Sequence, residues 1–509
     1  MNFMILRRAV KFFLFLLILF GLYLCAYSVL HGDIGYNTDV GRDLLILQDI
    51  VNTHKLPLIG PHSGLGGLFH GPLWPYIHLP VFILSSGNPI AIGWFWVFLV
   101  SCSVFATYIV GKKVFNQYVG LFSALILSLI SVGYSDSLLN PFGAVIFSPL
   151  FFYFFYKYVK TMKVGYLILA IFTIGILIQF EIVFGGPILI LSLLFLLVFL
   201  FKKKKLRHLL SVFVLVIPLS TYIIFELRHN FLQLRSIIFQ AGAQTGSGKM
   251  AFTAILQNRV DGFLNAILSI PSVPTLLTLS VIILFVFIAF KSLKDKKLKY
   301  REFYLLFIYF YLGYWPLTFY LRGQVMGYHV LPFTPVALIV LSSAYLLIRK
   351  EIFLIIFIFV LFFGSIVAKN KLDAFSSQTG SGTGSWKFSH QLAQAIFKNA
   401  PSEFGYYTFT ADEFGYGPRY AMVFTNKEYP KISALANTKK EVTYVIMAPT
   451  EGGVNNNREW WIKNKVRINK APESVISYAN GFEIEKFVLT DQEIKISSDP
   501  NLLNGLFFR

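Results

Sequence analysis

Long apolar runs separated by short polar segments dominate the chain as far as residue 367. A helix of about 20 apolar residues crosses the hydrocarbon core of a bilayer. Eleven runs approach that length, covering residues 12–30, 89–110, 119–133, 141–158, 164–180, 187–201, 209–225, 273–290, 303–321, 330–348 and 352–367. The pattern predicts a mainly α-helical polytopic membrane protein with about eleven transmembrane helices.

The pattern changes beyond residue 368, where charged residues return and short alternating runs appear. Alternation favours strands at residues 406–410 and 442–447, and a helical period favours helices at 388–398 and 458–466. These elements predict a small α/β domain.

Three segments follow from this change of pattern. Residues 1–368 form the transmembrane domain, residues 369–386 are expected to be a flexible Ser/Gly/Thr-rich linker, and residues 387–509 form the α/β domain.

The composition supports a membrane protein. Hydrophobic residues make up 56% of the chain and charged residues only 14%, whereas soluble domains carry about a quarter charged residues. The net charge of +20 would suggest nucleic acid on a soluble surface, but here the basic residues lie in short clusters between apolar runs. We therefore expect the lipid bilayer as a partner and no nucleic acid.

The basic clusters also predict the orientation. Loops on the side of the N-terminus hold 21 Lys and Arg residues, and the opposite loops hold 7 as far as Arg322. Because basic loops stay in the cytoplasm, we expect a cytoplasmic N-terminus and, after an odd number of spans, an extracytoplasmic C-terminal domain. The predicted location is the plasma or inner membrane.

The first outer loop, residues 31–88, is the best candidate for chemistry. If a helix begins near Thr38, Asp39 and Asp43 share one face, and Asp39 lies near the positive helix N-terminus, which favours the ionised form that a general base needs. The alternative is structural: Thr38 and Asp39 cap a surface helix, and Asp43 pairs with a neighbouring Arg. The sequence leaves both open. The apolar segment at residues 73–84 is too short to span and predicts an interfacial helix.

Several motifs in order resemble one family. They are Tyr36-Asn-Thr-Asp-Val-Gly-Arg-Asp43, Pro61-His-Ser-Gly-Leu-Gly-Gly-Leu-Phe-His-Gly-Pro-Leu73, Asn140-Pro141 and Phe225-Glu-Leu-Arg-His-Asn-Phe231. Together with an extracytoplasmic tail, they resemble the polytopic GT-C glycosyltransferases of families 39 and 83, which include rhizobial lipopolysaccharide transferases and are related to protein O-mannosyltransferases and the aminoarabinose transferase.

The resemblance implies transfer of a hexosyl or pentosyl group from a polyprenyl-phosphate donor to a lipid, glycan or protein acceptor on the outer face. It implies Asp39 as the base, with Asp43 and Arg42 supporting it, although Val40 stands where the mannosyltransferases carry the Glu of an Asp-Glu pair. His70 and Asn140 belong to the matching motifs, and Glu181 stands at the outer end of a span, where it would line the site.

A leaving phosphate needs a cation, because charge develops on it. The outer candidates are Arg228 and His229, which follow Glu226, and Arg322 and His329, which bracket the turn between two spans. The bland alternatives are an interface anchor paired with Glu226 for Arg228, and a helix-end residue with its charge in the headgroup layer for Arg322.

The sequence shows no clear metal site, and one rival function fits its topology. No zinc site is expected, since the histidines lack H-x-x-x-H spacing, and a divalent cation bridging Asp39, Asp43 and phosphate stays an alternative. A transporter or a flippase of lipid-linked sugars is the rival function. The paired carboxylates lie in a loop rather than within a span, which favours the transferase.

Overall fold

The computed structural model describes residues 3–63, 67–240, 251–265, 275–320, 324–410, 414–449 and 457–503. These residues form two compact units. Unit 1 comprises Met1–Ala26, Pro57–Ile77 and Trp96–Lys371, and unit 2 comprises Tyr27–Leu56, His78–Phe95 and Leu372–Arg509. Each unit is described separately below.

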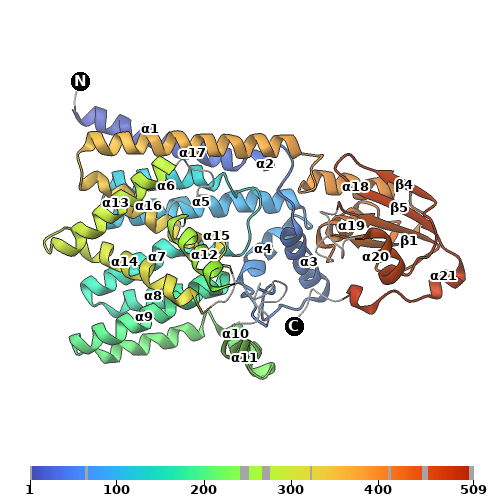
Figure 1. The fold of residues 1–509 in the computed structure, drawn as a ribbon, viewed down its shortest axis with the longest axis horizontal. Helices are drawn as coiled ribbons and strands as arrows, with labels where there is room; N and C mark the ends of the chain where they lie inside the picture. The colour runs from blue at the N-terminus through green and yellow to red at the C-terminus, as the bar shows by residue number, and fades with distance from the viewer. Residues whose placement is uncertain are drawn as a thin grey trace. The chain divides into compact units, whose positions relative to one another are not determined.

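The regular secondary structure of unit 1 is helical in its described part (Figure 1), apart from an isolated β-bridge between His62 and Phe69. Every predicted span contains helical structure. The elements are α1 (Phe3–Cys25), α6 (Gln117–Ser131), α7 (Pro141–Thr161), α8 (Val164–Phe180), α9 (Ile182–Lys203), η1 (Leu206–Val216), α10 (Ser220–Arg228), α11 (Leu232–Gln240), α12 (Phe252–Asn265), α13 (Thr275–Lys294), α14 (Arg301–Thr318), α15 (Gly327–Val330), η2 (Leu331–Phe333), α16 (Thr334–Ser342) and η3 (Ser343–Leu346), with most of α5 (Pro89–Val114) and α17 (Lys350–Gln378).

Six helical segments in the described part are long and apolar enough to cross a membrane. The bent pair η1 and α10, whose axes differ by 69°, would make a seventh span, and α6 and α8 are shorter apolar helices. The interfacial segment predicted at residues 73–84 is the apolar helix α4 (Leu73–Leu84), with Pro80 inside it. The protein is therefore a multi-pass membrane protein that is mainly α-helical as predicted, and the number of eleven spans stays a prediction.

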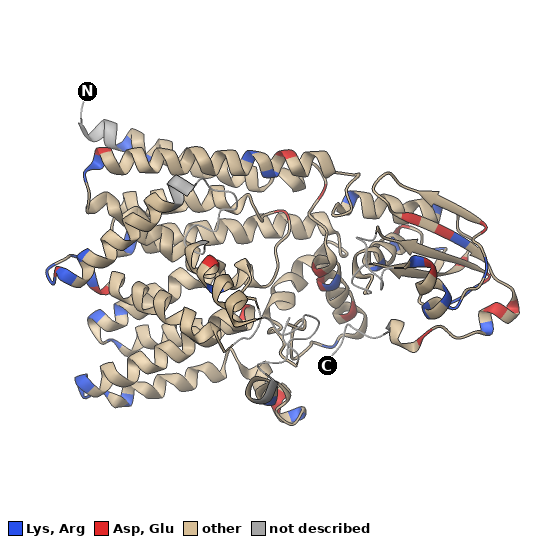
Figure 2. Ribbon diagram, viewed as in Figure 1, with Lys and Arg blue, Asp and Glu red and all other residues tan. Residues whose placement is uncertain are grey.

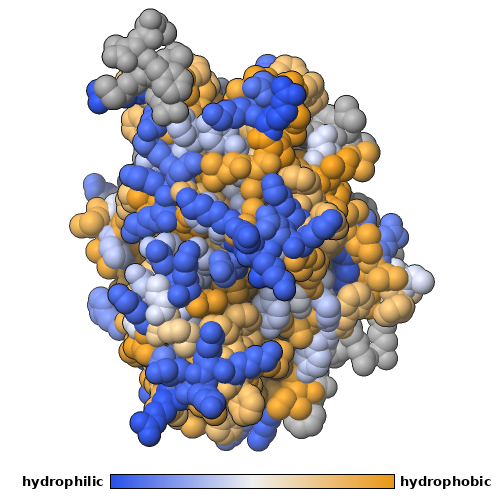
Figure 3. All heavy atoms as spheres, turned by 90° about the vertical axis from the view of Figure 1, so that its left-hand side faces the viewer, coloured by the Kyte–Doolittle hydropathy of each residue, from blue (hydrophilic) through white to orange (hydrophobic). Residues whose placement is uncertain are grey.

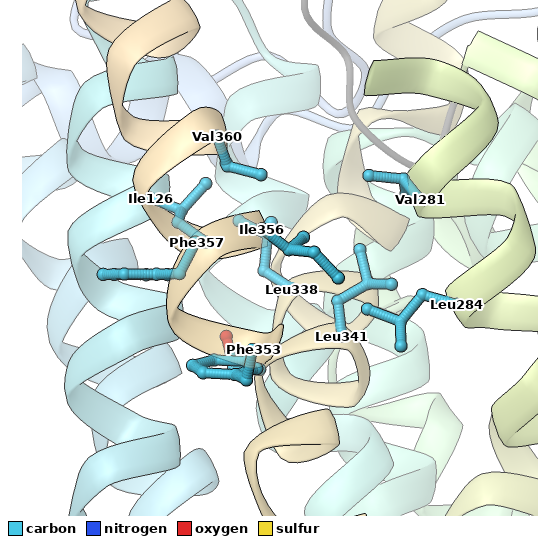
Figure 4. Close-up of a pocket in the computed structure, with 10 residues that line it drawn as sticks. Ile126, Val281, Leu284, Leu338, Leu341, Phe353, Ile356, Phe357 and Val360 are labelled. Carbon is cyan, nitrogen blue, oxygen red and sulfur yellow. The ribbon is translucent and has the colours of Figure 1, made fainter. Parts of the chain in front are cut away.

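The interior of unit 1 is packed with aromatic rings. Phe151, Phe152 and Phe155 of α7 all lie against Phe310 of α14, with ring centroids 5.3 to 5.4 Å apart. Edge-to-face rings at such distances stabilise a pair by about 0.5–1.5 kcal/mol beyond their burial. A small apolar cavity of about 30 Å³ lies where Ile126, Val281, Leu338 and Phe357 meet. Figure 4 shows the side chains that line it. This cavity is a packing gap, too small for a sugar.

The basic clusters of unit 1 gather at one end of its helices (Figure 2). They include Lys112 and Lys113 in the last turn of α5 and Lys202 and Lys203 in the last turn of α9. Figure 3 shows this end, where hydrophilic side chains spread across the face. The clustering agrees with the loops that the charge bias grouped together, and their cytoplasmic side stays a prediction.

Unit 2 contains the predicted α/β structure. Its five-stranded mixed sheet has the order β2-β1-β3-β5-β4, in which β1 pairs in parallel with β2 and β3, and β5 is antiparallel to β3 and β4. The elements are α18 (Trp386–Asn399), β1 (Glu403–Phe409), α19 (Tyr416–Glu428), β2 (Ser433–Ala436), β3 (Val442–Met447), α20 (Arg458–Trp461), a π turn (Ile462–Val466), β4 (Ser474–Ser477), β5 (Glu483–Val488), α21 (Asp491–Lys495) and η6 (Pro500–Leu503).

Unit 2 also contains part of the first outer loop, including α2 (Tyr27–Leu30) and α3 (Thr38–Thr53). The buried Asp33 carboxylate accepts hydrogen bonds from the Ser385 hydroxyl at 2.6 Å and the Lys387 N–H at 3.0 Å. The segment predicted as a linker holds the end of α17 as far as Gln378, and Ser385 caps α18. Unit 2 thus combines part of the first outer loop with the C-terminal segment, which the boundaries predicted from the sequence assign to different domains.

Candidate active site

Helix α3 begins where the sequence places a helix, but with a different cap. The Asn37 side chain accepts a hydrogen bond from the Val40 N–H at 3.0 Å and is the N-cap. Thr38 and Asp39 are the first two helical residues, so the part of the structural alternative in which they cap the helix is wrong. Its other part, in which Asp43 pairs with a neighbouring Arg, is confirmed by the ion pair between Arg42 and Asp43. Asp39 is the acidic residue of the first turn, where its charge is favoured by the helix dipole.

Arg42 joins the two predicted carboxylates. Its Nη1 donates to Asp39 Oδ1 at 2.5 Å, while Nε and Nη2 donate to Asp43 Oδ1 at 3.0 and 2.8 Å. The Asp39 side chain is 45% exposed, whereas those of Arg42 and Asp43 are 18% and 14% exposed. Burial alone would lower the pKa of Arg42, but Asp43 and Asp39 raise it above its usual value. Asp39 is therefore the more accessible of the two carboxylates.

Helix α3 is fixed against α19, its neighbour in Figure 1. A Cβ added at Gly41 would come within 2.7 Å of the Gly417 backbone, so the two helices approach as closely as glycine allows. The Tyr36 hydroxyl donates to the Gly417 carbonyl at 2.8 Å, and its ring lies edge-on to Trp386 at 5.1 Å. Because α3 and α19 are both helices, Asp39 is carried by a rigid element, as a reactive carboxylate requires.

A second group of candidates lies in unit 1 between α8 and α9. Glu181 is fully buried and caps α9, with Oε1 accepting from the Val183 N–H at 3.0 Å. Its Oε2 has no hydrogen-bond partner within the described residues. Asn140 donates to the Phe180 carbonyl at 2.7 Å and so fixes the backbone beside Glu181. A buried carboxylate oxygen without a partner costs stability, so this position is a candidate for binding a polar ligand.

Residues that the sequence analysis did not single out surround Glu181. Tyr222 and Tyr314 lie within electrostatic reach of it, and Gln179 donates to the Pro218 carbonyl at 2.7 Å. The Gln179 Oε1 and the Tyr314 hydroxyl are buried without a partner in the described part of the chain. In the sequence, only their position near the ends of apolar runs could have indicated them.

Arg259 is the most informative of the residues not singled out. It is 2% exposed, donates to the Asn258 side chain at 2.5 Å and to the Thr318 carbonyl at 3.2 Å, and lies within electrostatic reach of Tyr314 and His329. Arg259 is one of the seven basic residues in the loops predicted to lie outside. Its burial marks it out for attention, and hydropathy cannot predict that burial. His329 accepts from the Met326 N–H at 3.2 Å at the start of α15.

The predicted phosphate residues on α10 are arranged differently from the pairing considered above. The Glu226 carboxylate accepts from the backbone N–H groups of Gln233 and Leu234, both at 3.0 Å, at the start of α11. Arg228 is exposed, and no ion pair joins it to Glu226. The His229 ring stacks on Phe225 with centroids 4.1 Å apart. The Arg228 side chain is therefore accessible and not paired with Glu226.

The remaining candidates have simpler outcomes. The backbone of His70 donates to the Pro61 carbonyl at 3.0 Å and accepts from the Gly60 N–H at 2.7 Å. Arg322 lies outside the described residues. Within the described ranges, no three His, Cys, Asp or Glu side chains gather as a metal site would require.

Comparison with known proteins gives similarity of structure alone. No family model and no curated protein matches the sequence. The chain is similar to ArnT from Cupriavidus metallidurans, an aminoarabinose transferase, in the apo state (TM-score 0.60, 10% identity, 94% of this chain and 98% of ArnT).

It is similar to the same protein bound to undecaprenyl phosphate (TM-score 0.59, 10% identity, 96% and 99% of the two chains). The Archaeoglobus fulgidus oligosaccharyltransferase matches at a TM-score of 0.47, with 13% identity over 85% of this chain and 68% of that one. The likeness to ArnT confirms the resemblance noted in the sequence at the level of the fold, and the chain has the GT-C fold.

Proposed function

We propose that the protein is a membrane glycosyltransferase that moves a sugar from a polyprenyl-phosphate donor to a lipid, glycan or protein acceptor of the cell envelope, on the extracytoplasmic face. One observation carries the proposal: Asp39 is an exposed carboxylate that Arg42 holds on a fixed helix in a chain with the GT-C fold. The solved structure of ArnT with undecaprenyl phosphate supports a polyprenyl donor.

Transfer of a sugar from a lipid phosphate requires a general base and a cation. Asp39 takes the proton of an acceptor hydroxyl, whose oxygen bonds to the anomeric carbon of the sugar while the bond from that carbon to the phosphate oxygen breaks. General-base assistance of this kind contributes about 100- to 10,000-fold in rate. Asp43, held by two nitrogens of Arg42, keeps the guanidinium in position rather than taking the proton.

The phosphate carries charge in the donor and gains more as the sugar leaves, so a fixed cation favours both binding and reaction. We propose Arg228 for this role, with Arg322 as the reserve candidate. The exposure of Arg228 and its lack of an ion pair with Glu226 support the choice, because its guanidinium is available to a lipid phosphate. His229, His329, Glu181, His70 and Asn140 are proposed to line the donor site.

The test is transfer of radiolabelled sugar from an undecaprenyl-phosphate donor to envelope extracts by the purified protein, using Asp39→Asn and Asp43→Asn. Asp39→Asn keeps the shape but cannot accept a proton, so we expect a loss of about 100-fold or more. Asp43→Asn should lose less, because an amide oxygen still accepts from Arg42. Near-normal transfer by folded Asp39→Asn would remove the base from the proposal.

The same assay separates the rival function. A transporter or flippase of lipid-linked sugars would move the donor across a vesicle membrane without forming a new glycosidic bond. Mass spectrometry of surface glycans and lipid-linked sugars, with and without the gene, gives the cellular counterpart. Unchanged surface glycans with the protein present in the membrane would contradict the transferase.

A further inference from the structure

Unit 2 contains a polar pocket that the reaction proposed above does not use. Its volume is about 520 Å³, within the range of about 300–1,000 Å³ typical of small-ligand sites. The second half of α3, the last turn of α19 and the segment leading into β2 form its walls, and the buried Tyr406 of β1 also lines it. The polar residues around it are Gln48, Asn52, Asn426, Lys427, Lys431 and Ser433.

A chain of hydrogen bonds fixes the direction of two amides in this pocket. The Lys427 ammonium donates to Gln48 Oε1 at 2.6 Å and to the Ser86 carbonyl at 3.0 Å. Because an ammonium only donates, the Gln48 oxygen must face it. The Gln48 Nε2 then donates to Asn52 Oδ1 at 2.7 Å. Asn52 is left with its NH₂ group to offer to a ligand.

The other side of the pocket also offers donors. Asn426 Oδ1 accepts from the Ala434 N–H at 3.0 Å, which leaves the Asn426 NH₂ group. Lys427 has a third N–H beyond the two already used. Lys431 is exposed, and no ion pair to it is seen within the described residues. The acceptor oxygens of these amides are thus occupied, while the NH₂ groups of Asn52 and Asn426, one N–H of Lys427 and the Lys431 ammonium remain.

The charge of the pocket points the same way. None of the lining residues that the structure describes is acidic. The nearby Glu428 carboxylate is occupied by His390 at 2.9 Å and Gln394 at 3.1 Å. Burial lowers the pKa of Lys427, so its charged form would be stabilised by an anion in the pocket. A ligand that fits must supply acceptor oxygens and negative charge.

We propose that this pocket binds an anionic saccharide, a sugar carrying a carboxylate or a phosphate, as the remote part of the acceptor. Gln48 follows Asp39 by nine residues on α3, about 14 Å at about 1.5 Å per residue. The pocket therefore holds a part of the acceptor distant from the reacting hydroxyl. The assignment as an acceptor site rests on the proposed function, whereas the binding of an anionic sugar does not.

The experiment measures binding of three probes to the full-length protein in detergent by isothermal titration calorimetry. Trigalacturonate supplies carboxylates, glucose 6-phosphate supplies a phosphate, and maltotriose is neutral. The decisive variant is Asn52→Asp, which keeps the acceptor for Gln48 Nε2 but adds a negative charge to the pocket. We expect it to weaken binding of the anionic probe at least about tenfold, because facing like charges repel.

Matched variants complete the design. Lys431→Gln should weaken the same probe less, and Lys398→Gln, an exposed lysine at the end of α18 outside the pocket, should leave binding unchanged. If Lys431→Gln and Lys398→Gln weakened binding of the anionic probe equally, binding would depend on net charge alone, and the proposed site would be wrong. Wild-type protein that binds neither anionic probe, or binds maltotriose as tightly, would also overturn it.

Asp39→Asn distinguishes failure of this proposal from failure of the proposed function. We expect Asp39→Asn to bind the anionic probe normally while losing transfer. Transfer by a wild-type protein that binds no anionic probe would contradict the pocket and leave the transferase standing. Binding that Asn52→Asp abolishes, in a protein without any transfer, would support the pocket and contradict the transferase.

Discussion

At the scale of single residues, Arg42 decides how Asp39 is presented. Three of its nitrogens contact two carboxylates, at 2.5, 2.8 and 3.0 Å. Lysine carries one ammonium and cannot reproduce this fork. The orientation of Asp39 therefore depends on a guanidinium rather than on positive charge alone.

We expect Arg42→Lys to lower the rate of transfer by about 10- to 100-fold, the equivalent of one charge-assisted hydrogen bond of about 1.5–3 kcal/mol. The measurement is kcat with saturating donor. Arg467→Lys is the matched control, because its guanidinium lies in the same unit and donates to the Ser497 carbonyl at 3.0 Å. Equal rates for both variants would leave Arg42 without a role in orienting Asp39.

Arg228 gives the second prediction at this scale. Since its guanidinium is charged at any working pH, removing it should weaken both donor binding and single-turnover transfer. Arg228→Lys should rescue part of each, because it keeps the point charge and loses the two-pronged geometry. Arg235→Ala is the control, an exposed arginine on the neighbouring helix α11. Wild-type affinity in both Arg228 variants would assign the residue to anchoring at the interface.

The sequence predicts residues of this kind unevenly, for a physical reason. Asp39, Arg42 and Asp43 are close in sequence, so helical periodicity alone brings them together, as the structure shows. Arg259, Tyr222 and Tyr314 come from separate helices, and their burial depends on packing between distant segments. No local pattern carries that information.

At the scale of elements, the contact between α3 and α19 places the candidate base. The contact is asymmetric. A Cβ on Gly41 would lie 2.7 Å from the Gly417 backbone, whereas a Cβ on Gly417 would meet only a ring carbon of Tyr36 at 3.5 Å, an ordinary contact. The two glycines therefore differ in what a methyl group would do.

We expect Gly41→Ala to separate the helices and lower the free energy of unfolding by about 1–3 kcal/mol, as overpacking does, with a loss of transfer. Gly417→Ala should be tolerated, because alanine favours a helix over glycine by about 1 kcal/mol. Thermal denaturation followed by circular dichroism, together with the transfer assay, compares them. The reverse order of stabilities would contradict the close approach of α3 and α19.

The elements themselves were predicted where their pattern is strong. The apolar run at residues 164–180 is α8, and the alternating run at 442–447 is β3. Strand β4, Ser474–Ser477, is exposed at every position, so it has no buried alternation by which a sequence could reveal it. Edge strand β2 has only four residues, Ser433–Ala436, too few to establish a period.

At the scale of the whole molecule, the sequence predicts the order of the apolar helices and the distribution of charge along the chain. It does not predict the contacts between distant segments. The succession of apolar helices follows from hydropathy, because each helix satisfies its own backbone in lipid. The pairing of Asp33 with Ser385 and Lys387 joins residues more than 350 positions apart. Only the folded chain shows that part of the first outer loop and the C-terminal domain form one unit.

The last prediction concerns how the chain crosses the membrane. The loops assigned to the cytoplasm hold 21 basic residues and the opposite loops hold 7, and the larger set gathers at one end of unit 1 (Figure 2). Since basic residues resist translocation, alkaline phosphatase, which is active only outside the cytoplasm, should give signal when fused at the C-terminus. The same reporter fused after Lys205 should be inactive.

Immunoblots showing equal amounts of both fusions provide the control, and a cytoplasm-active reporter at the same two positions should give the opposite result. A third fusion after Lys55 tests the first outer loop independently of the later spans. With a cytoplasmic N-terminus, an active alkaline phosphatase after Lys55 and at the C-terminus requires an odd number of membrane crossings before each of these points. An active fusion after Lys205 combined with an inactive C-terminal one would invert the orientation, and Asp39 would then lie on the cytoplasmic side, where the proposed outer-face transfer could not use it.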